Sequence, residues 1–291
     1  MTLLRSLRLV LLCGLLGGLL SGCALKPLAL RALADELAAQ GAAPEEDVLL
    51  ARDAAPFYLK LSESVLAQTP GHLPLAAAVT GGFTQYAYAF VAFEAEKLEL
   101  QDARAARLQR ERAAGLYRRA QRQGWAALTQ GRPDLPAALQ GPGPVTLRRE
   151  ELPLAYWTAA AWAAWISLAK DDPETVADLP LVLRLAEAAY AVDPTQGEGA
   201  LATLLGQLEA GRPGGSAAVA RAYFDAARAA GQGRNAAVPL AEAEALAGDD
   251  RERFAALLRE ALRLSAARRD LASQLLRLRA QWLLDTLDER F

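Results

Sequence analysis

The sequence has very few of the residues that build metal sites, disulfides and thiol- or histidine-based catalytic sites. Only two of its 291 residues are cysteine, Cys13 and Cys23, and only one is histidine, His72. Both cysteines lie close to the N-terminus, and the histidine lies in a Pro-Gly turn. The sequence therefore offers no zinc-ligand cluster and no recognisable nucleophile motif. We predict no catalytic residue, no metal site and no cofactor, and hence a protein that is not an enzyme.

Neither sign of charge dominates, and strand-forming residues are scarce. The chain has 32 basic and 34 acidic residues, a formal net charge of -2, so nucleic acid is not an expected partner. Isoleucine occurs only at Ile166, and the alternating pattern of β-strands is hard to find. Alanine, leucine, arginine and glutamate, which favour helices, dominate instead. The composition predicts an all-α fold.

Long hydrophobic runs are also missing, and the run near the N-terminus is short. Arg5 and Arg8 precede an apolar stretch at residues 9–20, which is shorter than the roughly 20 residues that span a bilayer. This order is typical of an export signal. The stretch ends in Leu-Ser-Gly-Cys at residues 20–23, which resembles the lipobox of bacterial lipoproteins. An ordinary secretory signal with an incidental cysteine is the alternative.

The resemblance to a lipobox divides the chain into three parts. Residues 1–22 would be removed as a signal peptide, and Cys23 would carry acyl chains such as palmitate that insert into the lipid membrane. Residues 23–43 would form the lipid anchor and a tether, and residues 44–291 the folded domain. Because Ala24 rather than an aspartate follows the cysteine, we expect a periplasmic protein that is lipid-anchored to the outer membrane.

Helical segments follow one another along the chain, separated by turns that are rich in proline and glycine. Pro56 is expected to kink or split one of them. Residues 131–150 contain several glycines and prolines and are the best candidate for a boundary. The expected helices lie near residues 28–40, 44–68, 75–98, 102–130, 152–169, 180–192, 199–209, 216–230, 238–246, 251–264 and 270–287.

Three of the later helices share a spacing that places small and apolar residues on one face. The spacing resembles the second helix of a tetratricopeptide repeat (TPR), although the first half of that motif is not recognisable. It favours a TPR-like α-solenoid of helical hairpins with extra N-terminal helices. Helical hairpins without solenoid order are the alternative. The positions are Val182, Ala186 and Ala189; Ala220, Phe224 and Ala227; and Phe254, Leu258 and Ala261.

Two segments rich in aromatic residues are the best candidates for ligand or partner binding. Helical spacing places Tyr86, Phe90 and Phe93 on one face and Tyr88 on another. In residues 156–165, alanines separate bulky aromatic residues and leave room for a groove. Filling the core between hairpins is the alternative role. The candidate residues are Gln85, Tyr86, Tyr88, Phe90, Trp157, Thr158, Trp162 and Trp165, with Lys170 and Asp171 at the end of the second segment.

Several strings occur together in an unusual combination. They are Thr84–Val91, Tyr156–Trp162, Ser167–Glu174 and Trp282–Asp285, together with the loop Glu209–Gly215. The combination resembles the T-component (TatT) family of TRAP transporters over roughly residues 44–291. One departure is Leu208, where the family pattern leads us to expect an aromatic or polar residue.

The resemblance implies a periplasmic, TPR-like lipoprotein that works beside a TRAP-type solute-binding protein. It further implies an accessory scaffold for solute uptake, with an apolar or organic-acid ligand and a homo-oligomer as additional expectations. A different hypothesis is a TPR-like scaffold lipoprotein for envelope assembly that binds no ligand. A pocket lined by Trp157, Trp162, Tyr86 and Tyr88 would favour the first hypothesis, and a filled core there would favour the second.

Overall fold

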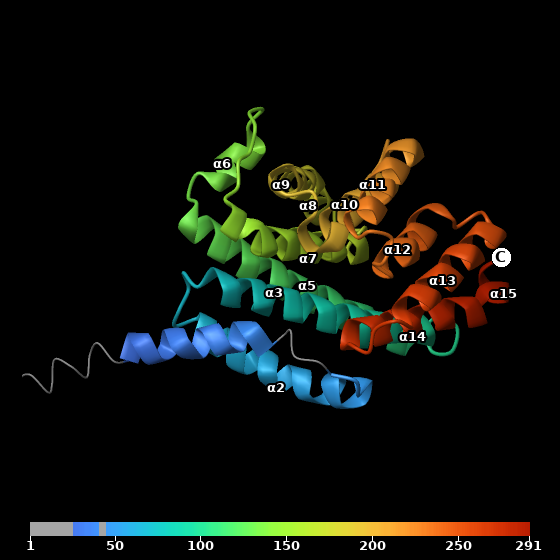
Figure 1. The fold of residues 1–291 in the computed structure, drawn as a ribbon, viewed down its shortest axis with the longest axis horizontal. Helices are drawn as coiled ribbons and strands as arrows, with labels where there is room; N and C mark the ends of the chain where they lie inside the picture. Colours follow the sequence, from blue (N-terminus) through green and yellow to red (C-terminus); the bar gives the residue numbers. More distant parts are fainter. Residues whose placement is uncertain (1–25, 41–44) are drawn as a thin grey trace, which may run out of the picture.

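The computed structural model describes residues 26–40 and 45–291, which form helices joined by loops (Figure 1). These residues contain no strand, so the all-α prediction is confirmed for them. The predicted signal peptide, residues 1–22, and the predicted acylation site, Cys23, lie outside the described residues. No helix in the described part of the chain is both long and apolar enough to cross a membrane.

Two helices at the N-terminal end lie along one side of the molecule (Figure 1). The first covers residues 26–40, and the second is α2 (Val48–Leu66). The carboxylate of Asp47 caps α2 by accepting hydrogen bonds from two backbone N–H groups at 2.9 and 3.0 Å. We expected a kink or a break at Pro56, but α2 runs through this residue as one helix.

The next helical segment contains one wide turn. Its spacing predicted a single helix at residues 75–98, but the structure has α3 (Leu73–Ala87), a π-helical turn at Tyr88–Ala92 and α4 (Phe93–Leu98). The backbone N–H of Phe93 donates to the carbonyl oxygen of Tyr88, five residues earlier. Residues five apart lie about 140° apart on an α-helix, but a π-helical turn brings them close to the same side.

Three helices, α3, α5 (Ala103–Gly131) and α7 (Leu152–Leu168), form the centre of the main core. They approach one another closely where Thr80, Gly124 and Thr158 meet. A Cβ atom added to Gly124 would lie 2.2 Å from Thr158 Oγ1 and 3.0 Å from Thr80 Cγ2. Both threonines are buried. Small side chains at this point allow the three helices to pack against one another directly.

The irregular stretch at residues 131–150 does not separate two cores. It contains helix α6 (Leu135–Gln140). Arg184 fixes the following loop by donating hydrogen bonds to backbone carbonyl oxygens, among them that of Gly143 at 2.5 Å. The helices on either side, α5 and α7, pack directly against each other, and one cluster of buried side chains draws on residues 34–208.

The later helices pack against their neighbours in chain order (Figure 1). The apolar faces predicted for three of them are buried, since each of the nine side chains is at most 4% exposed. Nothing in this arrangement conflicts with the predicted TPR-like packing. The elements are α8 (Pro173–Ala177), α9 (Leu179–Val192), α10 (Gln196–Gly211), α11 (Ala217–Ala230), α12 (Ala237–Leu246), α13 (Arg251–Ser265), α14 (Leu271–Asp285) and α15 (Leu287–Arg290).

The last long helix returns to the N-terminal part of the molecule. Helix α14 contacts α2, and the ring of Trp282 packs edge-on against that of Phe93 in α4, with 5.2 Å between centroids. From the same helix, Arg279 forms an ion pair with Glu96, 183 positions earlier. The row of helices therefore closes onto its own beginning, and α14 joins the two ends of the fold.

The close approach at Gly124 predicts a selective sensitivity to one added methyl group. Gly124→Ala should lower the free energy of unfolding by about 1–3 kcal/mol, because the methyl group overpacks the contact with Thr158 and Thr80. Gly115→Ala, in the same helix and with nothing within 4 Å of its Cβ, should be neutral or stabilising by up to about 1 kcal/mol. Urea unfolding followed by circular dichroism measures both. Equal stability of the two variants would contradict the proposed packing.

Candidate functional site

The candidate residues at the start and middle of α7 are packed against neighbouring helices. Trp162 is 4% exposed, and its ring packs edge-on against that of Trp125, with 5.4 Å between centroids. Trp157 lies over Gly81 of α3, where an added Cβ would come within 2.7 Å of the indole ring. Thr158 is buried in the contact with α5 described above. These side chains fill space between helices α3, α5 and α7.

The candidates near the end of α3 have more varied surroundings. Tyr86 and Phe90 form a tilted aromatic pair with 5.5 Å between ring centroids. Tyr86 and Trp165 both pack against a small cluster of buried residues that includes Tyr117. Gln85 is exposed to solvent. The structure thus gathers Tyr86 and Trp165 around one cluster, while Gln85 points away from the core.

Tyr88, the first residue of the π-helical turn, has one side exposed to solvent and one side covered by another helix. It is 39% exposed, yet burial raises its pKa well above the usual range. On its covered side, the ring faces the guanidinium group of Arg279 in α14, 5.1 Å from the ring centroid.

Arg279, of whose side chain only 8% is exposed, is the centre of a group of charged and aromatic side chains. Its Nε and Nη2 donate to Glu244 Oε1 at 3.0 and 2.5 Å. Its Nη2 also donates to the two carboxylate oxygens of Glu96 at 3.1 and 3.0 Å. The guanidinium group lies 5.1 Å from the ring centroid of Tyr88 and 5.2 Å from that of Phe93. We call these five residues the Arg279 cluster.

The π-helical turn explains how two aromatic residues reach the same cation. The sequence spacing placed Tyr88 on a different face from Phe93, and this prediction is wrong. The turn adds one residue to the helical repeat between them, so both rings face Arg279. π-helical turns of this kind are frequent at functional sites, and they carry no simple periodic signal in a sequence.

The charge of the Arg279 cluster depends on its two carboxylates. With both ionised, the cluster has a net charge of -1. Burial raises the pKa of Glu96, while the neighbouring Arg279 opposes this shift by stabilising the carboxylate. The phenol of Tyr117, which is 3% exposed, lies in the same electrostatic environment, and burial raises its pKa as well. Two partly covered carboxylates therefore share the one buried cation of α14.

Sequence reasoning missed Arg279, Glu96 and Glu244, although one signal for the arginine was available. Arg279 lies next to Ala280 and four residues before Leu283, both of which are buried. A charged residue on the apolar face of an amphipathic helix requires a buried partner. The signal points to Arg279 alone, because its acidic partners lie in distant helices.

Two other predicted elements lie at turns. Lys170 and Asp171 are exposed after the end of α7. In the loop Glu209–Gly215, the carboxylate of Glu209 accepts hydrogen bonds from Arg212 Nε at 2.6 Å and from the backbone N–H of Ser216 at 2.8 Å. These contacts stay within the loop, so they account for its shape without a ligand.

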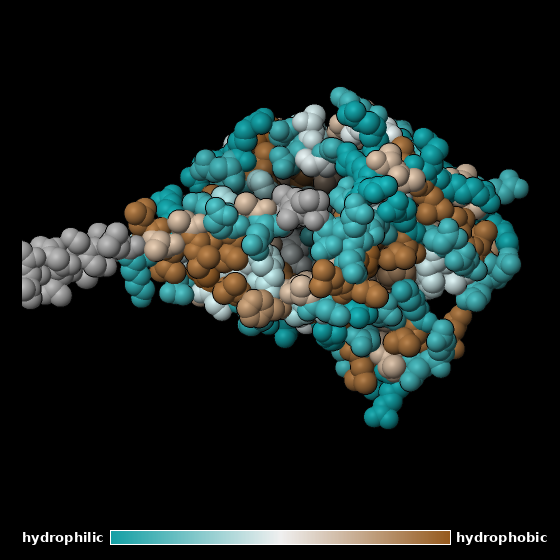
Figure 2. Space-filling model, turned by 60° about the horizontal axis from the view of Figure 1, so that its bottom comes forward, coloured by the Kyte–Doolittle hydropathy of each residue, from teal (hydrophilic) through white to brown (hydrophobic). Residues whose placement is uncertain are grey.

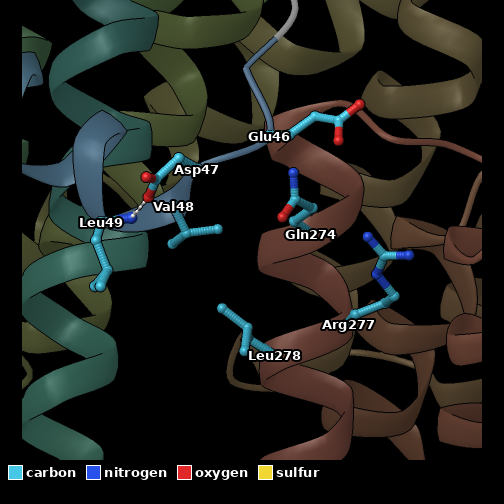
Figure 3. A pocket seen from close by; sticks show the side chains of 7 residues that line it. All are labelled: Glu46, Asp47, Val48, Leu49, Gln274, Arg277 and Leu278. Carbon is cyan, nitrogen blue, oxygen red and sulfur yellow. Dashed lines mark hydrogen bonds between the residues drawn. The ribbon is translucent and has the colours of Figure 1, made fainter.

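A groove of about 670 Å³ opens between the start of α2 and the outer side of α14 (Figure 3). Figure 3 shows Val48 and Leu49 on one side of the gap and Leu278 on the other. Leu49 and Leu278 are 62% and 51% exposed. The upper end is polar, with Glu46 near Gln274. None of the aromatic candidates lines this groove.

The ion pairs of the buried Arg279 predict that α14 depends strongly on this one cation. Arg279→Met should lower the free energy of unfolding at pH 7 by about 2–4 kcal/mol, because Glu96 and Glu244 would face each other without a counter-charge. The deficit should shrink as the pH falls, because burial raises the pKa of Glu96 and protonation of this carboxylate removes one of the two facing charges. Arg277→Met in the same helix is the control. Similar unfolding curves for the two variants in urea would show that apolar contacts alone hold α14.

Comparison with known proteins adds an independent observation to this geometry. Within residues 26–40 and 45–291, no three His, Cys, Asp or Glu side chains are grouped so that they could hold a metal ion. No curated protein matches the sequence. A family model described as TRAP transporter T-component matches residues 44–291, which includes every candidate side chain discussed above. The chain therefore belongs to the TRAP transporter T-component family.

Proposed function

We propose that this protein is a periplasmic accessory lipoprotein of a TRAP-type uptake system and that it binds the solute-binding component. The observation that carries the proposal is the family match over residues 44–291. A bound solute-binding protein would be held close to a membrane. This would be either the membrane that contains its permease or the membrane opposite it. No enzymatic step is part of this proposal, and no candidate residue is assigned a catalytic role.

The proposed location follows from the N-terminal sequence. Removal of residues 1–22 would leave Cys23 as the first residue, and its acyl chains would anchor the protein. Ala24 supports placement at the outer membrane, as argued from the sequence. The anchor and the family domain come from separate parts of the chain, since the family match begins at residue 44.

We also propose a ligand site beside the open side of Tyr88. The supporting observations are its 39% exposure and its contact with the guanidinium group of Arg279, which also faces Phe93. Because the cluster has a net charge of -1 when Glu96 and Glu244 are ionised, it disfavours a third carboxylate nearby. A site beside the Arg279 cluster therefore favours an apolar ligand with an uncharged polar end over an organic acid.

The alternative, a scaffold for envelope assembly without a ligand, has one observation in its favour. Trp162 is buried, and Trp157 fills the space above Gly81. Trp162 is therefore a core residue, and the partly buried Trp157 is packed against α3, so neither is the open pocket lining that the ligand hypothesis first used. The two functions now differ in what Tyr88 contacts and in whether a solute-binding protein associates with this chain.

Association with the solute-binding component is the direct test of the main proposal. The acylated protein in detergent micelles should bind the TRAP-type solute-binding protein of the same organism with micromolar or tighter affinity in titration calorimetry. Sedimentation of the same samples reports the oligomer. A periplasmic binding protein from a different transporter class serves as the control partner. No heat of binding with either partner would leave the envelope scaffold as the better hypothesis.

The ligand site makes a separate prediction about charge. Decanol should bind several-fold more tightly than decanoate at pH 7, measured by competition with Nile red, because the decanoate carboxylate meets the negative Arg279 cluster. Tyr88→Ala should weaken decanol binding, whereas Tyr223→Ala, at a tyrosine pair elsewhere in the fold, should not. Tighter binding of decanoate, or equal effects of the two substitutions, would contradict this site.

A further inference from the structure

Large apolar side chains are exposed mainly on the two N-terminal helices. Of the twelve exposed large hydrophobic residues, six lie in helix 26–40 and α2, and the other six are scattered over the rest of the described chain. Figure 2 shows apolar residues gathered beside the grey N-terminal trace. The six are Leu28 (66% exposed), Leu33 (43%), Leu49 (62%), Leu50 (56%), Phe57 (76%) and Leu61 (40%).

On α2 these residues follow a helical stripe. Leu50, Ala54, Phe57 and Leu61 are separated by four, three and four residues, so they lie along one side of the helix. The side of α2 that faces the core carries a different set, namely Leu59, Ser62, Val65 and Leu66. Helix α2 therefore has two apolar sides, and only one of them is used by the fold.

Helix 26–40 is attached to the domain rather than hanging from it. Ala34 and Leu37 are 0% and 4% exposed and belong to the main core. The hydroxyl of Tyr58 donates to the carbonyl oxygen of Leu37. A hydrogen bond joins His72 Nε2 to Asp35 Oδ1 at 2.9 Å. The position of residue 26 is thus fixed relative to the family domain, although the family match begins only at residue 44.

This attachment limits how far the domain can be from its proposed anchor. Three Cα–Cα steps separate Cys23 from Lys26, which span at most about 11 Å when fully extended. An acylated Cys23 lies at the membrane surface, so the start of helix 26–40 must lie there too. Lys26 and Arg31 are exposed near this end, where long basic side chains can reach lipid phosphates while their stems contact apolar surface.

We infer that the exposed apolar side of helix 26–40 and α2 rests on the lipid bilayer, with Phe57 and Leu28 inserted into the boundary between headgroups and acyl chains. Amphipathic helices that carry aromatic and leucine residues bind this boundary in the plane of the membrane. The inference rests on the proposed acylation of Cys23. It adds an orientation: the domain lies against the membrane on α2, and α9 and α11 lie on the opposite side of the molecule (Figure 1).

The arrangement of cysteines allows a direct measurement of depth. Cys13 would leave with the signal peptide, and the thiol of Cys23 would be blocked by lipid, so one introduced cysteine is the only free thiol. Phe57→Cys is labelled with bimane in the acylated protein and incorporated into vesicles of equal parts phosphatidylethanolamine and phosphatidylglycerol. Leu108→Cys on α5, where leucine is 53% exposed, is the matched control.

The label at position 57 should shift its emission to shorter wavelength and lose several-fold more intensity with brominated acyl chains than the label at position 108. Equal quenching at the two positions, with lipid on Cys23 confirmed by mass spectrometry, would overturn the inference and leave the proposed anchor intact. Absence of lipid on Cys23 would overturn the anchor and the inference together. A lipid-independent shift that grows with protein concentration would assign the face to a second copy of the chain and overturn the inference.

Discussion

The close approach of α3, α5 and α7 around Gly124 is the constraint on which the other features of this fold depend. Three helices can share one contact point only where their side chains are small, and here two threonines meet a glycine. This contact sets the spacing at which Trp157 can lie flat over Gly81 and Trp162 can reach Trp125. Trp162 of α7 is consequently part of the core.

The second constraint is the closure of the helical row by Arg279. A buried guanidinium group is costly unless carboxylates and hydrogen bonds compensate for its lost hydration. Glu96 and Glu244 supply these from two different helices, and the π-helical turn supplies two aromatic rings. Such a pairing specifies one docking position for α14, which apolar contacts alone would define less sharply. It also fixes Tyr88 with one side covered and the other open.

In this TRAP transporter T-component, the N-terminal surface and the Arg279 cluster have different proposed roles. The N-terminal helices combine a short path to the proposed lipid with a concentration of exposed leucine and phenylalanine. The Arg279 cluster lies between α4, α12 and α14 and controls the electrostatics beside Tyr88. If the exposed apolar side of helix 26–40 and α2 faces lipid, the helices farther from the membrane are available to bind a soluble partner.

The sequence by itself determined the helical class, the buried faces of α9, α11 and α13, and the family. These depend on local periodicity and on strings of neighbouring residues, which a linear sequence contains in full. Only the tertiary structure decided that Trp162 belongs to the core, that α5 and α7 pack across residues 131–150, and that Arg279 meets Glu96. Each of these is a contact between distant segments. Only the tertiary structure revealed the π-helical turn as well. A single inserted residue leaves the hydrophobic pattern of the helices before and after it unchanged, and it alters only which residues of the two helices share a face.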